Sequence, residues 1–295
     1  GVCFAHLCGR LNQGCGMMMQ TFLGCDKSYE DADTVIFGAP FDSTTSYRPG
    51  ARFGSRTMRA ESYALETYSP YLDRDMADKA VCDLGELELC FGDSQAALDA
   101  IEQQTARIIA DGKRPVMIGG EHLVSLGAIR AAAKAYPDLH VVHFDAHADL
   151  RDDYLGAPMS HAAVIRRVWD ILGDGRIYQF GIRSGDRPEF LWAAEGHVKM
   201  SKFGFGGLKE TVMRLMDKPV YFTLDLDVLD PSAFPGTGTP EPGGVTFKEL
   251  LEAVFEVCRL NIVGCDLVEL SPVYDPSGAS VAAALKLLRE MLLAM

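Results

Sequence analysis

Several features are missing from this sequence, and each absence narrows the function. No apolar run reaches the roughly 18 to 20 residues of a transmembrane helix. Only eight cysteines occur in 295 residues and none forms a Cys-x-x-Cys pair, which favours a reduced cytoplasmic protein over a disulfide scaffold. Lysine and arginine number 28 against 41 acidic residues, and the net charge of −13 disfavours nucleic acid and anionic membranes as partners. Neither a G-x-G-x-x-G motif nor a P-loop is present, which argues against dehydrogenases and kinases.

The composition is that of an ordinary globular protein, with 48% apolar and 23% charged residues. We find no internal repeat, low-complexity tract or linker, so residues 20–295 are predicted to form a single domain. Residues 1–19 lack the pattern of a signal peptide and end in three methionines, Met17 to Met19. We interpret them as an N-terminal extension or a start-site artefact. The acidic balance mildly favours a small cationic substrate.

Short apolar runs alternate with amphipathic stretches of helical period along the chain. The predicted strands are Thr34–Ala39, Ala80–Leu84, Pro115–Ile118, Leu139–Phe144, Ile177–Phe180, Val198–Met200, Val220–Leu226 and Ile262–Val268. The predicted helices are Ser55–Thr67, Ser94–Asp111, Val124–Ala135, His161–Leu172, Pro188–Glu195, Leu208–Met216, Thr246–Arg259 and Gly278–Leu293. This alternation predicts a parallel sheet covered by helices, with ligands beyond the carboxyl ends of the strands. The count of eight fits a closed barrel and an open sheet equally well.

The clearest chemical signal follows the predicted strand that ends near Phe144. Asp145, His147 and Asp149 alternate along the chain, so in an extended backbone their side chains share one face. Three residues that can bind metals on one face indicate a metal site more than a solvated loop. His143 has the same parity but lies deeper in the strand, where we expect a hydrogen-bonded core histidine.

A second cluster ends the strand that begins near Val220. Asp225 and Asp227 lie on one face there, where two unpaired carboxylates would repel each other unless a cation held them. Asp230, just before Pro231, is typical of a turn and is not assigned to the site.

A third contribution is the run from Ile118 to His122, in which a strand leads into two glycines and then an imidazole. Two imidazoles and four carboxylates exceed the needs of one tetrahedral zinc ion and suit two hard divalent cations, preferably Mn²⁺. The predicted metal ligands are His122, Asp145, His147, Asp149, Asp225 and Asp227.

From about Asp33 to its end the chain resembles the ureohydrolase family of arginases and agmatinases, and within it bacterial agmatinases most closely. The matching motifs, in the family's order, are Gly38-Ala39-Pro40-Phe41-Asp42, Ser46-Tyr47-Arg48-Pro49-Gly50-Ala51-Arg52-Phe53-Gly54, Gly119-Gly120-Glu121-His122, Asp145-Ala146-His147-Ala148-Asp149, Ser160-His161, Leu224-Asp225-Leu226-Asp227-Val228-Leu229-Asp230-Pro231, Pro235-Gly236-Thr237-Gly238-Thr239-Pro240 and Asp266-Leu267-Val268-Glu269-Leu270-Ser271-Pro272. Departures are Glu121 where Asp is usual, Ala148 where Thr is common and Ala162-Ala163 where many agmatinases carry Gly-Thr. None replaces a predicted ligand.

The resemblance implies a three-layer α/β/α fold around an open, mainly parallel eight-stranded sheet, and a homotrimer or homohexamer. It also implies that His122 and Asp149 hold one of two Mn²⁺ ions and that His147 and Asp227 hold the other. Asp145 and Asp225 are then shared between the ions. Such a pair of cations can make hydroxide available near neutral pH for attack on a guanidinium carbon.

Three further roles follow from the same resemblance. Glu269 corresponds to the carboxylate that grips the guanidinium through charge-assisted hydrogen bonds. His161 corresponds to the mobile acid/base histidine, for which the pKa of imidazole is suited. The proton for the leaving amine is assigned to Asp227 or to His161, and the sequence leaves both open.

The substrate tail is predicted from the residues after Asp149. Arginases carry an Asn and small hydroxyl residues there to bind the α-carboxylate of arginine, whereas this chain has Leu150-Arg151-Asp152-Asp153-Tyr154. Asp152 and Asp153 would oppose a carboxylate and suit the distal ammonium of agmatine. We therefore expect an enzyme that releases urea and putrescine from agmatine. The alternatives are a guanidinobutyrase, formiminoglutamase or arginase, and, from another class, a non-catalytic metal-binding assembly protein.

Overall fold

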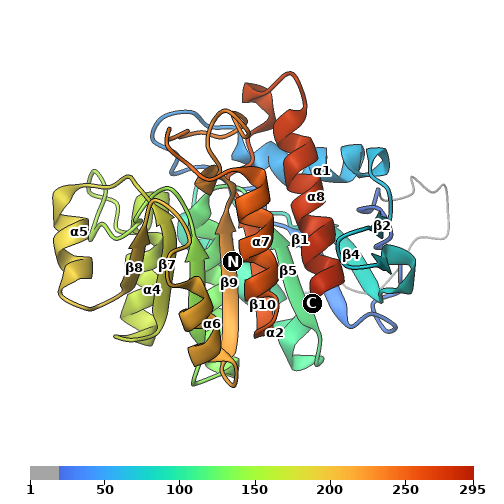
Figure 1. The fold of residues 1–295 in the computed structure, drawn as a ribbon, viewed down its shortest axis with the longest axis horizontal. Coiled ribbons are helices and arrows are strands. Elements are labelled where there is room, and N and C mark those ends of the chain that lie inside the picture. Colours follow the sequence, from blue (N-terminus) through green and yellow to red (C-terminus); the bar gives the residue numbers. More distant parts are fainter. Residues whose placement is uncertain (1–19) are drawn as a thin grey trace, which may run out of the picture.

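An eight-stranded sheet in which every pairing is parallel forms the middle layer of the protein. The computed structural model describes residues 20–295, and Figure 1 shows helices on both sides of this sheet. From one edge to the other the strands are β4 (Val81–Glu86), β1 (Thr34–Gly38), β5 (Arg114–Ile118), β10 (Asn261–Val268), β9 (Pro219–Asp225), β6 (His140–Phe144), β7 (Ile177–Ile182) and β8 (Lys199–Lys202).

The central strands are continuous apolar runs because helices cover them on both faces. All five residues of β1 and of β6 are buried, including the ring of Phe144, which packs edge-on against Phe180 and Phe222. Alternation of polar and apolar residues is therefore lost in these strands, as is usual for parallel sheets. β-Branched and aromatic residues fill them, since such side chains pack well on a pleated surface.

The helices form two layers, each with its own apolar core. On one face Met58, Val212, Val254 and Leu288 belong to the same buried cluster, and Figure 1 shows α7 and α8 crossing that face. This layer contains α1 (Gly54–Glu61), α6 (Leu208–Leu215), α7 (Phe247–Val257) and α8 (Ala279–Ala294). The opposite layer contains α2 (Ser94–Ala110), α3 (Ser125–Ala135), α4 (Val164–Leu172) and α5 (Arg187–Ala194). The predicted three-layer α/β/α fold is confirmed.

The strand order brings the segments that contain the predicted metal ligands side by side at the carboxyl ends of the strands. β5, β10, β9 and β6 are consecutive neighbours, although they are distant in sequence. Asp225 at the end of β9 pairs with Val268 of β10, and Leu224 pairs with Phe144 of β6. The chain segments that leave these four strands therefore meet at their carboxyl ends, where parallel α/β folds bind ligands.

The sheet is open, with β4 and β8 as its edges, which excludes the barrel that the strand count alone had allowed. A small antiparallel pair was not predicted from the sequence, because two-residue strands have no periodicity. It consists of β2 (Tyr68–Ser69) and β3 (Arg74–Asp75). The sequence analysis also joined short 3₁₀ segments to two helices, at Ser62–Ala64 and His161–Ala163. Residues 1–19, with the proposed start near Met17, lie outside the described residues. Between residues 20 and 295 no helix is long and apolar enough to cross a bilayer.

Gly120 permits a close backbone approach beneath the site. A Cβ atom at this position would lie 2.0 Å from the carbonyl oxygen of Phe41, which accepts a hydrogen bond from the Glu121 N–H at 2.8 Å. The Gly120 carbonyl in turn accepts from the Glu269 N–H at 2.9 Å. Only a residue without a Cβ fits between these two segments.

We predict that Gly120→Ala lowers the free energy of unfolding by about 1 to 3 kcal/mol or more, since overpacking forces the backbone to shift. Gly92→Ala is the control, because a Cβ at Gly92 has no neighbour within 4 Å. Thermal unfolding followed by circular dichroism compares the two variants with the parent chain. Equal melting temperatures for all three would contradict the prediction.

Candidate metal centre and active site

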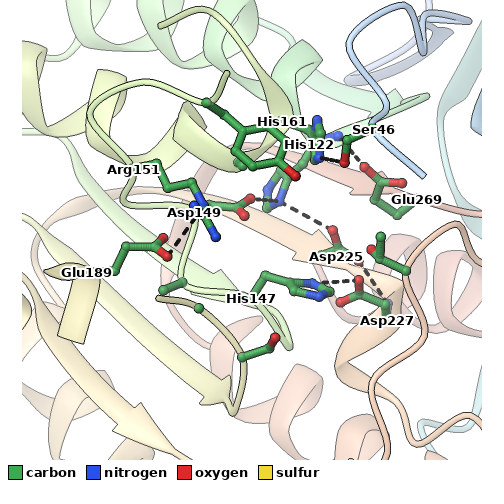
Figure 2. Close-up of a pocket in the computed structure, with 16 residues that line it drawn as sticks. Ser46, His122, His147, Asp149, Arg151, His161, Glu189, Asp225, Asp227 and Glu269 are labelled. Carbon is green, nitrogen blue, oxygen red and sulfur yellow. Dashed lines mark hydrogen bonds and ion pairs between the residues drawn. The ribbon is translucent and has the colours of Figure 1, made fainter. Parts of the chain in front are cut away.

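A polar cavity of about 210 Å³ opens at the carboxyl edge of the sheet. Figure 2 shows that its walls come from several parts of the chain, including His122 after β5, His147 and Asp149 after β6, and Asp225 and Asp227 around the end of β9. The six predicted metal ligands all lie in or against this cavity. They are His122, Asp145, His147, Asp149, Asp225 and Asp227.

The first group of ligand atoms surrounds Nδ1 of His122. This nitrogen lies 3.0 Å from Asp145 Oδ2, 3.1 Å from Asp149 Oδ2 and 3.4 Å from Asp225 Oδ2. The other ring nitrogen, Nε2, lies 2.9 Å from the Thr223 hydroxyl. If Nε2 carries the hydrogen for Thr223, Nδ1 presents its lone pair to the carboxylates, which is the arrangement of a metal-binding imidazole.

The second group shares Asp145 with the first. His147 Nδ1 lies 3.0 Å from Asp227 Oδ2 and 3.5 Å from Asp145 Oδ1. Asp145, His147 and Asp227 each offer one ligand atom within 4.8 Å of the others. Asp227 Oδ2 is buried and makes no well-aligned hydrogen bond, so it has lone pairs to offer a cation. Two adjoining ligand groups with a shared carboxylate fit a pair of divalent cations.

The charges in this cluster are unfavourable without a cation. Burial, and then the negative charge of Asp145, raises the pKa of Asp149 to about 7. Burial together with Asp227 and Asp145 raises the pKa of Asp225 well above its usual value. Burial also works against ionisation of His122, but its hydrogen bonds to Asp145, Asp149 and Asp225 outweigh this and raise its pKa. Hard carboxylate oxygens and imidazoles in this number suit divalent cations such as Mn²⁺.

Two residues of the site hold an uncommon backbone conformation. Asp149 has φ 54° and Glu269 has φ 68°, the left-handed region that non-glycine residues seldom adopt. Glu269 directly follows β10, whereas Asp149 lies in the segment beyond the end of β6, and both side chains line the cavity. Such local strain persists where the surrounding structure enforces it and is frequent at functional sites.

Of the residues that support the ligands from behind, only His143 was singled out from the sequence. The Thr223 hydroxyl lies 2.7 Å from Asp266 Oδ1, so the chain from His122 through Thr223 ends on a buried carboxylate. His143 Nε2 lies 2.8 Å from Asp145 Oδ2, and its Nδ1 lies 3.1 Å from the Gln179 amide nitrogen. Both nitrogens of His143 are thus engaged, which matches the expected hydrogen-bonded core histidine. Such partners orient metal-binding side chains.

The two remaining predicted catalytic residues lie on the cavity wall. Glu269 is buried, and its Oε1 accepts a hydrogen bond from the His122 N–H at 2.8 Å. Burial and the negative charges of Asp227 and Glu121 raise the pKa of Glu269 well above its usual value. His161 is half-buried, and burial followed by the charge of His147 lowers its pKa to about 4. A cationic group entering the cavity would restore ionisation of Glu269, while His161 stays neutral at pH 7.

The expected substrate-tail residues Asp152 and Asp153 do not line this cavity. Asp152 pairs with Arg167 of α4 at 3.0 Å with its side chain 80% exposed, and Asp153 accepts the Gly156 N–H within a turn. Both border a separate hollow beyond Arg151. Their assignment was made from their charge and their place after Asp149, and neither feature determines the direction of a loop side chain.

Arg151, Tyr154 and Glu189 form the outer wall in their place. Arg151 Nη1 lies 3.0 Å from Asp186 Oδ2, its Nε lies 3.7 Å from Glu189 Oε2, and its guanidinium stacks 4.8 Å from the Tyr154 ring centre. The sequence pattern around Glu189 predicts only a helix start, because Asp186 and Glu189 form a capping box at the beginning of α5. It does not indicate that Glu189 lines a cavity.

An open parallel sheet with such a paired-cation site at its carboxyl edge defines a metal-dependent hydrolase fold of the α/β class. The chain belongs to the arginase family, whose model matches residues 32–294. An agmatinase from Bacillus subtilis (strain 168) is 50% identical over 277 residues, covering 93% of this chain and 96% of that protein. The human mitochondrial guanidino acid hydrolase is 36% identical, over 95% of this chain and 82% of its own length. A crystal structure of a provisionally assigned agmatinase from Clostridium difficile superposes with a TM-score of 0.89 at 52% identity, covering 90% of this chain and 98% of that one.

Cation binding should be strongly pH-dependent. Asp149, with a pKa of about 7, and Asp225, His122 and His147, whose pKa values are also raised, must lose protons before they bind a cation. Affinity should therefore rise with pH between 6 and 8, by about tenfold per pH unit for each proton released. Titration of metal-stripped protein with Mn²⁺ in a calorimeter, in buffers of different ionisation enthalpy, measures both affinity and proton release.

The matched variant for this experiment is Asp149→Asn, which removes one of the titrating carboxylates and should flatten the pH dependence while weakening binding. Affinity that is constant from pH 6 to pH 8 in the parent protein would contradict the prediction.

Proposed function

We propose that this protein hydrolyses agmatine to putrescine and urea with two Mn²⁺ ions per subunit. The observation that carries the proposal is the buried carboxylate of Glu269 beside two adjoining ligand groups, in a chain half identical to an agmatinase over nearly its whole length. We further propose a cytoplasmic homotrimer or homohexamer, as expected from the family resemblance. The hard oxygen donors favour Mn²⁺, although other divalent transition metals compete for such sites.

A guanidinium resists hydrolysis because resonance stabilises the cation and water is a weak nucleophile. Two divalent cations, when bound by the six ligands, would supply hydroxide at neutral pH by lowering the pKa of water. Glu269 would hold the guanidinium by charge-assisted hydrogen bonds, since its carboxylate has no cationic side chain as partner among residues 20–295. Release of the amine then requires a proton on its nitrogen, and Asp227 or His161 would pass on to it the proton that the attacking hydroxide loses.

The tail of the substrate would extend from Glu269 towards the outer wall. Among the described residues that line the cavity, Arg151 is the one lysine or arginine, and its charge is already engaged by Asp186 and Glu189. A substrate carboxylate would therefore find no free lysine or arginine on this wall, and it would face the carboxylate of Glu189. An ammonium group at the end of the tail suits this wall better, which favours agmatine over arginine and over guanidino acids.

We predict that kcat/KM for agmatine exceeds that for arginine and for 4-guanidinobutyrate by at least about 10³, because burial of an unmatched carboxylate costs several kcal/mol. Competing the substrates on manganese-loaded protein and quantifying putrescine, ornithine and 4-aminobutyrate tests this. Ornithine or 4-aminobutyrate in equal or greater yield would overturn the agmatine assignment and leave ureohydrolase activity standing. Absence of urea from every guanidino compound would instead favour a non-catalytic metal-binding protein.

The role of His161 can be separated from that of the ligands. His161→Ala should retain bound metal and lower kcat by roughly 10² to 10⁴, the usual range for a general acid or base. Asp225→Asn should instead lower the metal content per subunit, which elemental analysis measures. Loss of metal from the His161 variant would show that this residue is a ligand rather than a proton carrier.

A further inference from the structure

The imidazole of His161 is held by polar groups from one loop, the segment between Asp42 and Gly50. The Thr44 Oγ1 atom lies 3.1 Å from the His161 backbone nitrogen and 3.3 Å from its Nδ1. The Ser46 hydroxyl lies 3.4 Å from Nε2, on the side that faces the cavity (Figure 2). The edge-to-face ring of Tyr154 lies 5.9 Å away. Residues 117 positions apart in sequence thus meet at the ring that is proposed to move protons.

Glu121 fixes the middle of this loop. Its side chain is fully buried, and its Oε1 accepts the Thr44 hydroxyl at 2.5 Å. Its Oε2 accepts the Thr44 N–H at 2.9 Å and the Thr45 hydroxyl at 3.1 Å. Two adjacent threonines therefore bond to the same carboxylate, but only Thr44 also contacts His161.

A count of hydrogen atoms assigns the tautomer of His161. With Glu121 ionised, the one hydrogen of the Thr44 hydroxyl is donated to Glu121, so towards His161 this oxygen accepts. Nδ1 must then carry a hydrogen, whether the ring is neutral or protonated. Nε2 is left as the nitrogen that gains and loses a proton, and it lies on the cavity side beside Ser46.

We propose that Thr44, anchored by Glu121, is a positioning residue that fixes the orientation and the Nδ1–H tautomer of His161. This inference rests on the proposed function, because the orientation of His161 affects turnover only if that histidine transfers protons. A misdirected imidazole transfers protons poorly even when the substrate binds normally. Loss of the Thr44 hydroxyl should therefore reduce kcat more than it changes KM.

The chain offers a matched control in the neighbouring residue. Thr44→Val and Thr45→Val each remove one hydroxyl hydrogen bond to Glu121, and each replaces threonine with a side chain of the same shape. If the hydroxyls merely anchor the loop, the two variants should lose activity equally. If Thr44 orients His161, only Thr44→Val should lose activity. Thr44→Ser keeps the hydroxyl and should therefore keep its activity.

The experiment measures kcat, KM and bound metal for the manganese-loaded variants Thr44→Val, Thr44→Ser, Thr45→Val, His161→Ala and the double variant Thr44→Val/His161→Ala. We expect Thr44→Val to lower kcat by roughly 10-fold to 100-fold with little change in KM or metal content. Thr44→Ser and Thr45→Val should stay within about threefold of the parent. In the His161→Ala background, Thr44→Val should add less than about twofold, because its partner is gone.

Equal losses in Thr44→Val and Thr45→Val, or an undiminished effect of Thr44→Val without His161, would overturn the inference. A readout independent of turnover is the ¹⁵N spectrum of labelled histidine in protein loaded with a diamagnetic divalent cation, with the His161 signals identified by their loss in His161→Ala. The Nδ1–H form should dominate in the parent and decline in Thr44→Val, and dominance of the Nε2–H form in the parent would refute the assignment. A parent protein that shows the Nδ1–H form and yet releases no urea would overturn the proposed function instead.

Discussion

The crowding of negative charge at the carboxyl ends of β6 and β9 is the constraint on which this structure depends. Asp145, Asp149, Asp225 and Asp227 are all buried, and the nearest groups that can carry positive charge are three imidazoles whose nitrogens approach the carboxylates at 2.8 to 3.5 Å. Carboxylates so placed shift upward in pKa or bind cations. The strands beneath them are buried and largely apolar, so divalent cations would be an effective counter-charge for this cluster.

Every neighbouring feature keeps this cluster in place. Thr223 and His143 engage His122 and Asp145 from behind, so the faces of the ligands that point into the cavity are left for cations. The strained backbone of Asp149 is held by the N–H groups of Ile165 and Arg166, which donate to its carbonyl, and that of Glu269 by its own N–H, which donates to the Gly120 carbonyl. The inner half of the cavity is therefore held by hydrogen bonds from behind its ligand side chains.

The outer half is built differently, from loops and ion pairs. Arg151 is neutralised by Asp186 and Glu189, and the loop that carries Thr44 and Ser46 lies against His161. These contacts join loops that follow three different strands. They hold the outer wall of the cavity and the imidazole ring of His161. Under the proposed function, discrimination among guanidino substrates would therefore depend on residues outside the six predicted cation ligands.

The sequence by itself determined the eight strands, the eight main helices and the six ligand candidates. It could do so because buried parallel strands are continuous apolar runs, and because Asp145, His147 and Asp149 alternate at a strand end, where parity fixes side-chain direction. The strand count left barrel and open sheet undecided, and the tertiary structure confirms the open sheet that the family resemblance implied. Only the tertiary structure decided that Asp152 faces Arg167 instead of the cavity, and that Glu121 and Thr44 meet across 77 positions to hold His161. The physical reason is that loops have no period, so the direction of a loop side chain is set by whichever distant segment packs against it.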